Sequence, residues 1–347
     1  MSGQPLVSVV IPCRNERRYI GPCLDALLAM DYPHDRLEIL VVDGMSDDGT
    51  REVLASYAAR HPMVRVLDNP ARVTPNALNI GVTTSRGAII MPIGAHNSSP
   101  PHYIARLVEC LEESGADNVG GILTTEPGGT GAVARAIAVA MAHPFGVGNA
   151  HFRIGTREPR WVDTVPFGCY RREVFERIGL FDEDLIRNQD DELNIRLIRA
   201  GGRILLVPDV VSSYHARDSL AKLWRMYYQY GYFKPLVARK VGGVFTWRQL
   251  VPPTFVLALA ASLILALAWG AAAPLPFVIV AVYLAVVLLI AAPAARRHGL
   301  RVALALCAAI PVLHLSYGCG FLRGVVDFLI LRRTSARGAP AAVPTSR

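Results

Sequence analysis

Charge is missing from long parts of this 347-residue sequence. No Asp, Glu, Lys or Arg occurs in Leu250–Ala295, a stretch of 46 residues, or in Val302–Leu322, a stretch of 21. A helix needs roughly 20 apolar residues to cross a bilayer. The longer stretch is interrupted by Gly270–Pro276, so it predicts a helical hairpin with two membrane spans. Buried core helices of a soluble protein are the alternative, but soluble cores rarely need uncharged runs this long.

Acidic residues are almost absent from the C-terminal part. From Arg217 onward, 15 Lys and Arg face only Asp218 and Asp327, a net charge of +13, whereas residues 1–216 carry −5. Basic residues beside apolar spans favour the anionic cytosolic leaflet, so membrane lipids are expected partners. These residues form no separate basic module, so no nucleic-acid partner is expected.

Signal-peptide and paired-cysteine patterns are also missing. Leu6–Pro12 is too brief for the apolar core of a signal peptide, so we expect a catalytic domain in the cytosol. The six cysteines show neither a Cys-x-x-Cys pair nor metal-ligand spacing, which favours buried thiols.

The charge pattern predicts a multi-pass protein of the cytoplasmic membrane. Residues 1–248 are expected in the cytosol, with spans near 252–270, 275–293 and 302–322 and a cytosolic loop at 294–301. Three full spans would place Arg332, Arg333 and Arg337 outside, against the positive-inside rule, so the third segment either spans or is re-entrant.

What the first 216 residues contain is an alternation of apolar runs and helical patterns. Such alternation predicts an α/β fold with a mainly parallel sheet. The expected strands are Val7–Ile11, Leu37–Val42, Val64–Leu67, Ala88–Pro92 and Arg203–Val207. The expected helices are Tyr19–Met30, Thr50–Arg60, Asn76–Thr83, Phe175–Gly179 and Asp191–Ala200.

Polar residues follow several of these predicted strands. They are Arg14–Glu16, Asp43–Asp48 and the loop from Gly94. In open α/β sheets ligands bind beyond the carboxyl ends of the strands, so this placement favours a nucleotide site. Ordinary loop polarity would explain any one of these segments alone.

Several segments, in order, resemble glycosyltransferase family 2 with its GT-A fold. They are Val10–Glu16, Val41–Thr50, Arg72–Gly81, Val162–Gly168 and Asn188–Arg196. The most similar subgroup is that of succinoglycan-glucosyltransferase-like, membrane-anchored enzymes of exopolysaccharide assembly. The resemblance implies a nucleotide-diphosphate sugar donor, with a UDP-sugar expected.

The resemblance also implies nucleotide-binding residues at the strand ends. Asp43 is expected to contact the base or ribose, and Asp48 to support the same loop or simply to cap the helix from Thr50. The full set implied for the nucleotide sugar is Pro12, Arg14, Glu16, Asp43, Asp48, Arg72 and Asn79.

Inverting transfer needs a general base for the acceptor hydroxyl. The family has a late Asp preceded by Glu. Here the segment reads Gln189, Asp190, Asp191, Glu192, so the resemblance assigns the base to Asp190. An acidic helix N-terminus favoured by the helix dipole is the structural alternative, and both can hold.

The metal motif departs from the family. Gly94 stands where relatives have the first carboxylate of Asp-x-Asp or Asp-x-His, and His96 stands where a ligand falls. The resemblance implies Mg²⁺ or Mn²⁺, for which a single imidazole makes a thin site. His96 could instead hydrogen-bond the diphosphate directly, or be purely structural.

The acceptor side is expected around Asp163 and Gly168, with Gln189, Asp191, Glu192 and Arg225 as further candidates. A glycine at 168 would permit close approach of a sugar. The Gln-x-x-Arg-Trp motif of processive relatives is absent, which argues against a processive polymer synthase.

The sequence thus predicts four regions. They are a GT-A domain at 1–216, amphipathic interfacial helices at 217–250, a membrane domain at 251–331 and a disordered tail at 332–347. The leading function is transfer of one sugar to a polyprenyl-linked or other membrane-proximal acceptor. A polyprenyl-phosphate sugar synthase and a non-enzymatic membrane scaffold with a nucleotide-binding fold are the alternatives.

Overall fold

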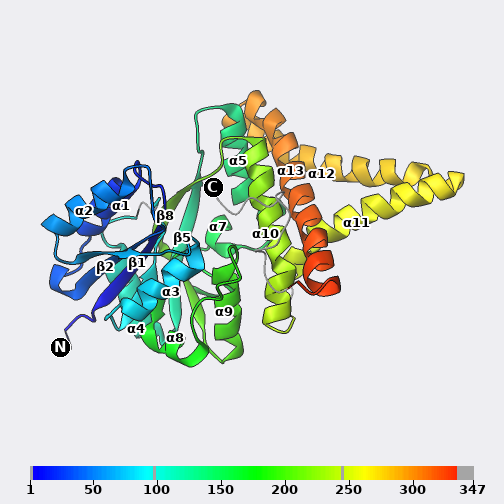
Figure 1. Ribbon diagram of the computed structural model, residues 1–347. Helices are drawn as coiled ribbons and strands as arrows, with labels where there is room; N and C mark the ends of the chain where they lie inside the picture. The colour runs from blue at the N-terminus through cyan, green and yellow to red at the C-terminus, as the bar shows by residue number, and fades with distance from the viewer. Residues whose placement is uncertain (1–2, 97–98, 244–245, 334–347) are drawn as a thin grey trace. The chain divides into compact units, whose positions relative to one another are not determined.

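The computed structural model describes residues 3–96, 99–243 and 246–333. The chain forms two compact units (Figure 1). The first contains the residues up to Thr124 and Gly155–Tyr214, and the second contains Thr125–Ile154 and the chain from His215 onward. The segment Thr125–Ile154, which lies inside the predicted catalytic region 1–216, therefore groups with the C-terminal helices. The predicted tail, 332–347, lies almost wholly outside the described residues.

The first unit is built on a mixed sheet with the strand order β3-β2-β1-β4-β7-β5-β8-β6. The strands are β1 Val7–Cys13, β2 Leu37–Asp43, β3 Val64–Asp68, β4 Ile89–Pro92, β5 Asn118–Glu126, β6 Arg160–Val162, β7 Cys169–Arg171 and β8 Ile204–His215. The four strands β3, β2, β1 and β4 are parallel, and β7 runs antiparallel to both β4 and β5. The predicted α/β fold with a mainly parallel sheet is confirmed.

Helices cover both faces of the parallel strands. They are α1 Ile20–Leu28, α2 Thr50–Arg60, α3 Thr74–Thr84, α4 Tyr103–Ser114, α8 Arg172–Ile178 and α9 Gln189–Arg199, with a 3₁₀ turn at His34–Arg36. Val9 and Ile11 share one core with α1, α2 and α4. Val10 points to the other face, where a Cβ at Gly81 of α3 would lie 2.2 Å from its Cγ1. Glycine at 81 therefore lets α3 approach the strand closely.

The register of the parallel strands brings their carboxyl ends to one edge. Cys13 of β1 pairs with Asp43 of β2, and Asp43 pairs with Asp68 of β3. The loops that follow β1 and β2 therefore begin side by side, as the sequence predicts for a nucleotide site.

The second unit is helical. Its helices are α5 Ala132–Ala142, α6 Pro144–Val147, α7 His151–Ile154, α10 Leu220–Lys240, α11 Trp247–Ala268, α12 Pro274–His298 and α13 Leu300–Gly324, with a 3₁₀ turn at Gly270–Ala272 and a π-helix at Val325–Ile330. The chain breaks between α11 and α12 where the glycine and prolines predict it. The expected loop at 294–301 is shorter than predicted, since only Gly299 separates α12 from α13.

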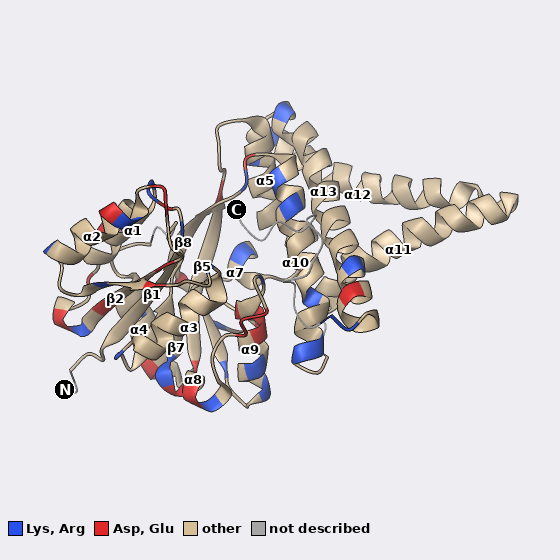
Figure 2. Cartoon of the chain, viewed as in Figure 1, with Lys and Arg blue, Asp and Glu red and all other residues tan. Residues whose placement is uncertain are grey.

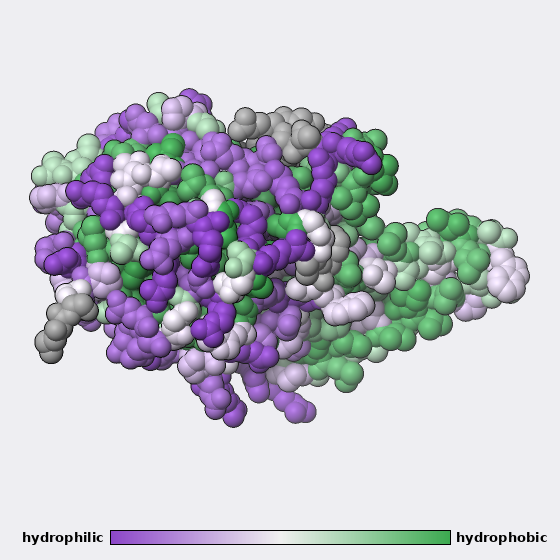
Figure 3. Space-filling model, turned by 90° about the horizontal axis from the view of Figure 1, so that it is seen from below, coloured by the Kyte–Doolittle hydropathy of each residue, from purple (hydrophilic) through white to green (hydrophobic). Residues whose placement is uncertain are grey.

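Three helical stretches among the described residues are long and apolar enough to cross a membrane. They are Trp247–Ala268, Gly270–His298 and Leu300–Ile330. The first two are mostly exposed, whereas half of the third is buried within the protein. Nearly all of α11 and α12 is uncharged in Figure 2, and Figure 3 shows hydrophobic surface over this hairpin.

The third stretch packs along α10 through glycines. A Cβ at Gly231 would lie 2.1 Å from the carbonyl oxygen of Tyr317, and one at Gly320 would lie 2.1 Å from that of Tyr228. The two helix backbones therefore touch, which only glycine permits. Side chains add to this contact, because the Tyr232 hydroxyl donates to Asp327 at 3.0 Å. Much of α10, expected as an interfacial helix, is thus buried in protein contacts.

Candidate active site

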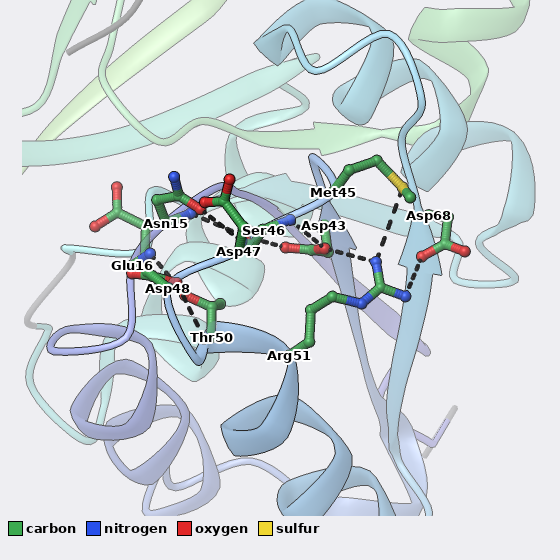
Figure 4. A network of polar contacts seen from close by, with 10 residues as sticks. All are labelled: Asn15, Glu16, Asp43, Met45, Ser46, Asp47, Asp48, Thr50, Arg51 and Asp68. Atoms are coloured by element: carbon green, nitrogen blue, oxygen red, sulfur yellow. Dashed lines mark hydrogen bonds and ion pairs between the residues drawn. The ribbon is translucent and has the colours of Figure 1, made fainter.

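The loop after β2 is organised by a buried carboxylate, Asp43, which has no solvent exposure. Its Oδ1 accepts from the Ser46 hydroxyl at 2.5 Å, and its Oδ2 accepts from the Ser46 amide at 3.0 Å. Arg51 of α2 donates to Oδ2 at 2.9 Å and also pairs with Asp68 at the end of β3 (Figure 4). Asp43 therefore fixes the conformation of the loop that follows it. Through Arg51, its salt bridge also joins the ends of β2 and β3.

A second set of bonds joins this loop to the one after β1. The Asn15 amide donates to the Ser46 hydroxyl at 2.8 Å, and the Asn15 side-chain oxygen accepts from the Asp47 amide at 3.1 Å (Figure 4). The Glu16 amide donates to the Thr50 hydroxyl at 2.9 Å. The two loops thus hold each other in place.

Asp48 supports the same junction. Its Oδ1 accepts from both the hydroxyl and the amide of Thr50, and its Oδ2 accepts from the Arg17 amide at 3.3 Å. Desolvation raises the pKa of this carboxyl, but these hydrogen bonds outweigh it and keep the pKa below its usual value. Asp48 therefore links the two loops and accepts from the first residue of α2, although Gly49 is the N-cap residue of that helix.

The remaining nucleotide candidates divide into two groups. Pro12 lies within β1, and the exposed Arg14 reaches the backbone oxygen of Arg72 at 3.5 Å, so these three lie around the same edge. Asn79 does not. Its side chain bonds the backbone of Phe181 and the carboxylate of Glu183, which ties α3 to a distant segment.

The segment after β4 is where the sequence differs from the family's metal-binding motif. Gly94 offers no ligand, and the His96 Nε2 lies 2.6 Å from Oε2 of Glu16 at the end of β1. The Tyr19 ring packs against the His96 ring with centroids 3.9 Å apart. Among the described residues, no three His, Cys, Asp or Glu side chains cluster closely enough to hold a metal by themselves.

The candidate base lies on the first turn of α9. Asp190 is exposed, and Asn188 caps the helix in a left-handed conformation with φ +61°. Glu192 instead is buried and forms a bidentate pair with Arg196 at 2.6 and 2.8 Å. The acidic cluster Gln189–Glu192 is therefore divided between an exposed Asp190 and a buried, structurally engaged Glu192, with Asp191 partly exposed between them.

A buried polar network lies beneath that turn. The side-chain oxygen of Asn194 accepts from Asn118 at 3.1 Å and from the Tyr170 hydroxyl at 3.0 Å, and its amide donates to the Thr164 hydroxyl at 2.9 Å. Burial, followed by the charge of Asp190, raises the pKa of Tyr170, so this network lies in the field of the candidate base.

This network connects α9 to the loop that contains Asp163 and Gly168, where the sequence predicts the acceptor side. A Cβ at Gly168 would lie 2.2 Å from Oδ1 of Asn118, so close packing inside the protein requires this glycine. Arg225 lies on α10 in the second unit and is exposed.

The sequence analysis does not identify several polar residues that shape the site, because they do not belong to a cluster of charged residues. They are Asn15, Ser46, Thr50, Arg51, Asn118, Thr164 and Asn194. Asn15, Ser46 and Thr50 stand inside the resembling segments, so their positions at strand ends carried a usable signal. Asn118 follows no such pattern, and only the fold reveals its role.

Two loops that hydrogen-bond to each other lie at the carboxyl edge of a parallel sheet, and an acidic helix lies beyond an antiparallel strand. This arrangement defines a nucleotide-sugar transferase of the GT-A class. Residues 8–179 match the family described as Glycosyl transferase family 2. The succinoglycan biosynthesis protein ExoA of Rhizobium meliloti (strain 1021) is 30% identical over 334 residues, which cover 94% of this chain and 98% of that protein. The chain therefore belongs to glycosyltransferase family 2 and is a glycosyltransferase.

Other proteins are similar over much of the chain. A dolichyl N-acetyl-alpha-D-glucosaminyl phosphate 3-beta-D-2,3-diacetamido-2,3-dideoxy-beta-D-glucuronosyltransferase of Methanococcus voltae is 31% identical, covering 71% of this chain and 77% of that protein. The mannosyltransferase PcManGT of Pyrobaculum calidifontis, solved with GDP-Man and Mn²⁺, has a TM-score of 0.58 at 23% identity and covers 94% of this chain and 88% of its own. That likeness shows the shared fold. The enzyme interpretation is confirmed, and the scaffold interpretation is set aside.

Proposed function

We propose that the protein transfers one sugar, with inversion, from a nucleoside-diphosphate sugar to a lipid-linked acceptor at the cytosolic face of the membrane. A UDP-sugar is the expected donor. The names of relatives support the acceptor class, because one acts on a dolichyl-phosphate-linked sugar and another takes part in succinoglycan biosynthesis. The largely uncharged α11–α12 hairpin would anchor the enzyme where such acceptors lie.

The observation that carries this proposal is the division of the acidic cluster on α9. Glu192 is engaged by Arg196, whereas Asp190 is exposed on the first helical turn beside Tyr170. The Asp190 carboxylate takes the proton from the acceptor hydroxyl while the acceptor oxygen bonds the anomeric carbon. The bond from that carbon to the diphosphate oxygen breaks, and the nucleoside diphosphate leaves with the bonding electrons.

A divalent cation, when bound, neutralises the charge that develops on the leaving diphosphate. The rest of the work falls to this chain's residues. The loops around Asp43 and Asp48 hold the nucleotide, and the network through Asn194 orients the first turn of α9.

The test is single-turnover transfer by Asp190→Asn, with Asp191→Asn as the matched control on the same turn. Because a positioned base contributes roughly 10²–10⁴ in rate, Asp190→Asn should lose about that factor while donor affinity stays normal. Asp191→Asn should cost much less. Transfer by Asp190→Asn close to the wild-type rate would remove Asp190 from the chemistry. A dead Asp191→Asn beside an active Asp190→Asn would move the base by one residue.

A second acceptor class is favoured by one relative. The dolichyl-phosphate beta-glucosyltransferase ALG5C of Trichomonas vaginalis is 33% identical over 97 residues, which cover 26% of this chain and 29% of that protein. An acceptor panel separates the two reactions, using polyprenyl phosphate in one arm and a polyprenyl-diphosphate-linked sugar in the other. Product formed only with the glycosylated lipid supports our proposal, and product formed only with polyprenyl phosphate supports a polyprenyl-phosphate sugar synthase.

A further inference from the structure

At the end of β4, Gly94 supplies no carboxylate for a cation, although the position can accept a side chain. A Cβ added at Gly94 would meet Cε1 of Phe167 at 3.5 Å, which is ordinary van der Waals contact. Neither a close approach nor a left-handed backbone therefore explains a glycine at this position. Another residue at this edge must therefore supply a carboxylate if a cation binds here.

The neighbouring strand supplies a carboxylate at the same edge. Glu16 follows β1, is only 6% exposed, and places Oε2 2.6 Å from Nε2 of His96. Its backbone is fixed on both sides, because its amide donates to Thr50 and its carbonyl accepts from Tyr19 and Ile20. The Tyr19 ring in turn packs against His96. One carboxylate and one imidazole are thus held together in place.

Two other carboxylates of this edge are already engaged in building the loops. Asp43 is bonded by Ser46 and Arg51, and Asp48 by Thr50 and Arg17. Both sets of bonds build the loops, so neither group can turn to a cation without dismantling them. Glu16 instead faces His96.

We propose that Glu16 and His96 together hold the divalent cation of the donor diphosphate, with Glu16 supplying from β1 the carboxylate that Gly94 cannot supply from β4. Two protein ligands suffice where substrate phosphates and water complete the coordination, as is common for cations at nucleotides. A set that mixes an imidazole with a carboxylate suits Mn²⁺ better than Ca²⁺. This inference rests on the proposed function, because its ligand is the diphosphate of the donor.

The test measures Mn²⁺ directly, by the loss of the free-ion EPR signal on adding full-length protein in detergent, with UDP or GDP present. Wild type should bind about one Mn²⁺ in the presence of the preferred nucleotide. Loss of an outer-shell partner already weakens metal binding about 10-fold, so Glu16→Gln and His96→Ala should each weaken it by at least that factor. Thermal unfolding checks that both variants remain folded.

Gly94→Asp provides the sharper arm, since a Cβ at this position makes only ordinary van der Waals contact, with Phe167. In the Glu16→Gln background it should restore Mn²⁺ binding, whereas the uncharged Gly94→Asn should not. Mn²⁺ affinity unchanged in folded Glu16→Gln would overturn the inference. So would undiminished nucleotide binding and transfer in EDTA, which would leave the proposed function standing. Failure to bind any nucleoside diphosphate, with or without Mn²⁺, would count against the proposed function itself.

Discussion

At the scale of single residues, the charges in this site divide into those that build it and those that are available for chemistry. Asp43 is fully buried and bonded only from within, yet it follows a strand in the segment that resembles the family's nucleotide motif. We expect Asp43 to act on the nucleotide through the loop that it shapes. Asp190 differs in its exposure, because it lies on the surface of the first turn of α9, whereas Glu192 of the same turn is buried and engaged by Arg196.

Replacing Asp43 should therefore weaken donor binding without unfolding the chain. Asp43→Asn leaves Ser46 and Arg51 without their anionic acceptor, and an unsatisfied buried group costs about 1–3 kcal/mol. We expect affinity for the donor nucleotide to fall about 10-fold, as calorimetry would measure. Asp68→Asn is the matched control, because it removes the other carboxylate of Arg51 and leaves Ser46 bonded. Unchanged affinity in Asp43→Asn would exclude Asp43 from the nucleotide site.

Acid should loosen the same junction through Asp48. The folded-state pKa of this carboxyl lies below its ordinary value of 3.8, so its stabilising effect is complete above that pH and is lost as the pH falls through the lower folded-state value. Unfolding midpoints of wild type and Asp48→Asn should therefore differ at pH 6 and converge as the pH is lowered below 3.8. A constant difference across this range would contradict the assignment.

At the scale of elements, the strands of the parallel half were predictable because each is an apolar run that ends at a polar residue or proline. Leu37–Val42 and Val64–Leu67 match β2 and β3 to within one residue. The antiparallel strands β6 and β7 have three residues each, too few to show a period. The grouping of Thr125–Ile154 with the C-terminal helices depends on contacts distant in sequence, which no local pattern encodes.

The candidate site shows the same contrast. Charged residues at strand ends were predictable, since the chain direction of a parallel sheet fixes where they gather. Asn118 was not, because it stands outside the resembling segments and a lone amide is equally common on surfaces. Asp190 and Asn194 are four residues apart and thus share a face of α9, so the buried network lies directly beneath the candidate base.

Cutting one bond of that network should affect turnover more than donor binding. Thr164→Val keeps the shape of the side chain but removes the acceptor for the Asn194 amide, which loosens α9 against the acceptor-side loop. We expect kcat to fall about 10-fold, the cost of one unsatisfied buried group, with little change in nucleotide affinity. Thr164→Ser restores the hydroxyl and should restore kcat. An equal loss in both variants would indicate a packing effect rather than this hydrogen bond.

At the scale of the whole molecule, the three apolar stretches are not equivalent. Side chains of α11 and α12 are largely exposed, for example Leu267 at 81% and Leu289 at 75%, as lipid-facing residues would be. By contrast, α13 packs along α10 and α5, and His314 in its middle bonds the backbone of Phe145 in α6. The three stretches are alike in length and composition, but α13 is packed against other helices whereas α11 and α12 are largely exposed.

The partner of α13 decides its topology. Helix α10 carries Lys222, Arg225, Lys234, Arg239 and Lys240, and charges of this number are too costly for a membrane span. Backbone contact at Gly231 and Gly320 binds α13 to that helix, so α13 must remain on the same side of the membrane. We therefore predict two spans, α11 and α12, with α13 outside the hydrocarbon core and Arg332 and Arg333 on the cytosolic side, in accord with the positive-inside rule.

Cysteine accessibility in sealed, right-side-out membrane vesicles distinguishes two spans from three. Gly270→Cys, in the open turn between α11 and α12, should react with an impermeant maleimide from outside. His298→Cys, just before α13, should react only after the vesicles are opened. A cysteine at position 340, beyond the described residues, should behave like His298→Cys if α13 does not cross, because both then lie in the cytosol. Labelling of position 340 from outside, with position 298 still protected, would show that α13 spans the membrane and that its contact with α10 does not hold in the bilayer.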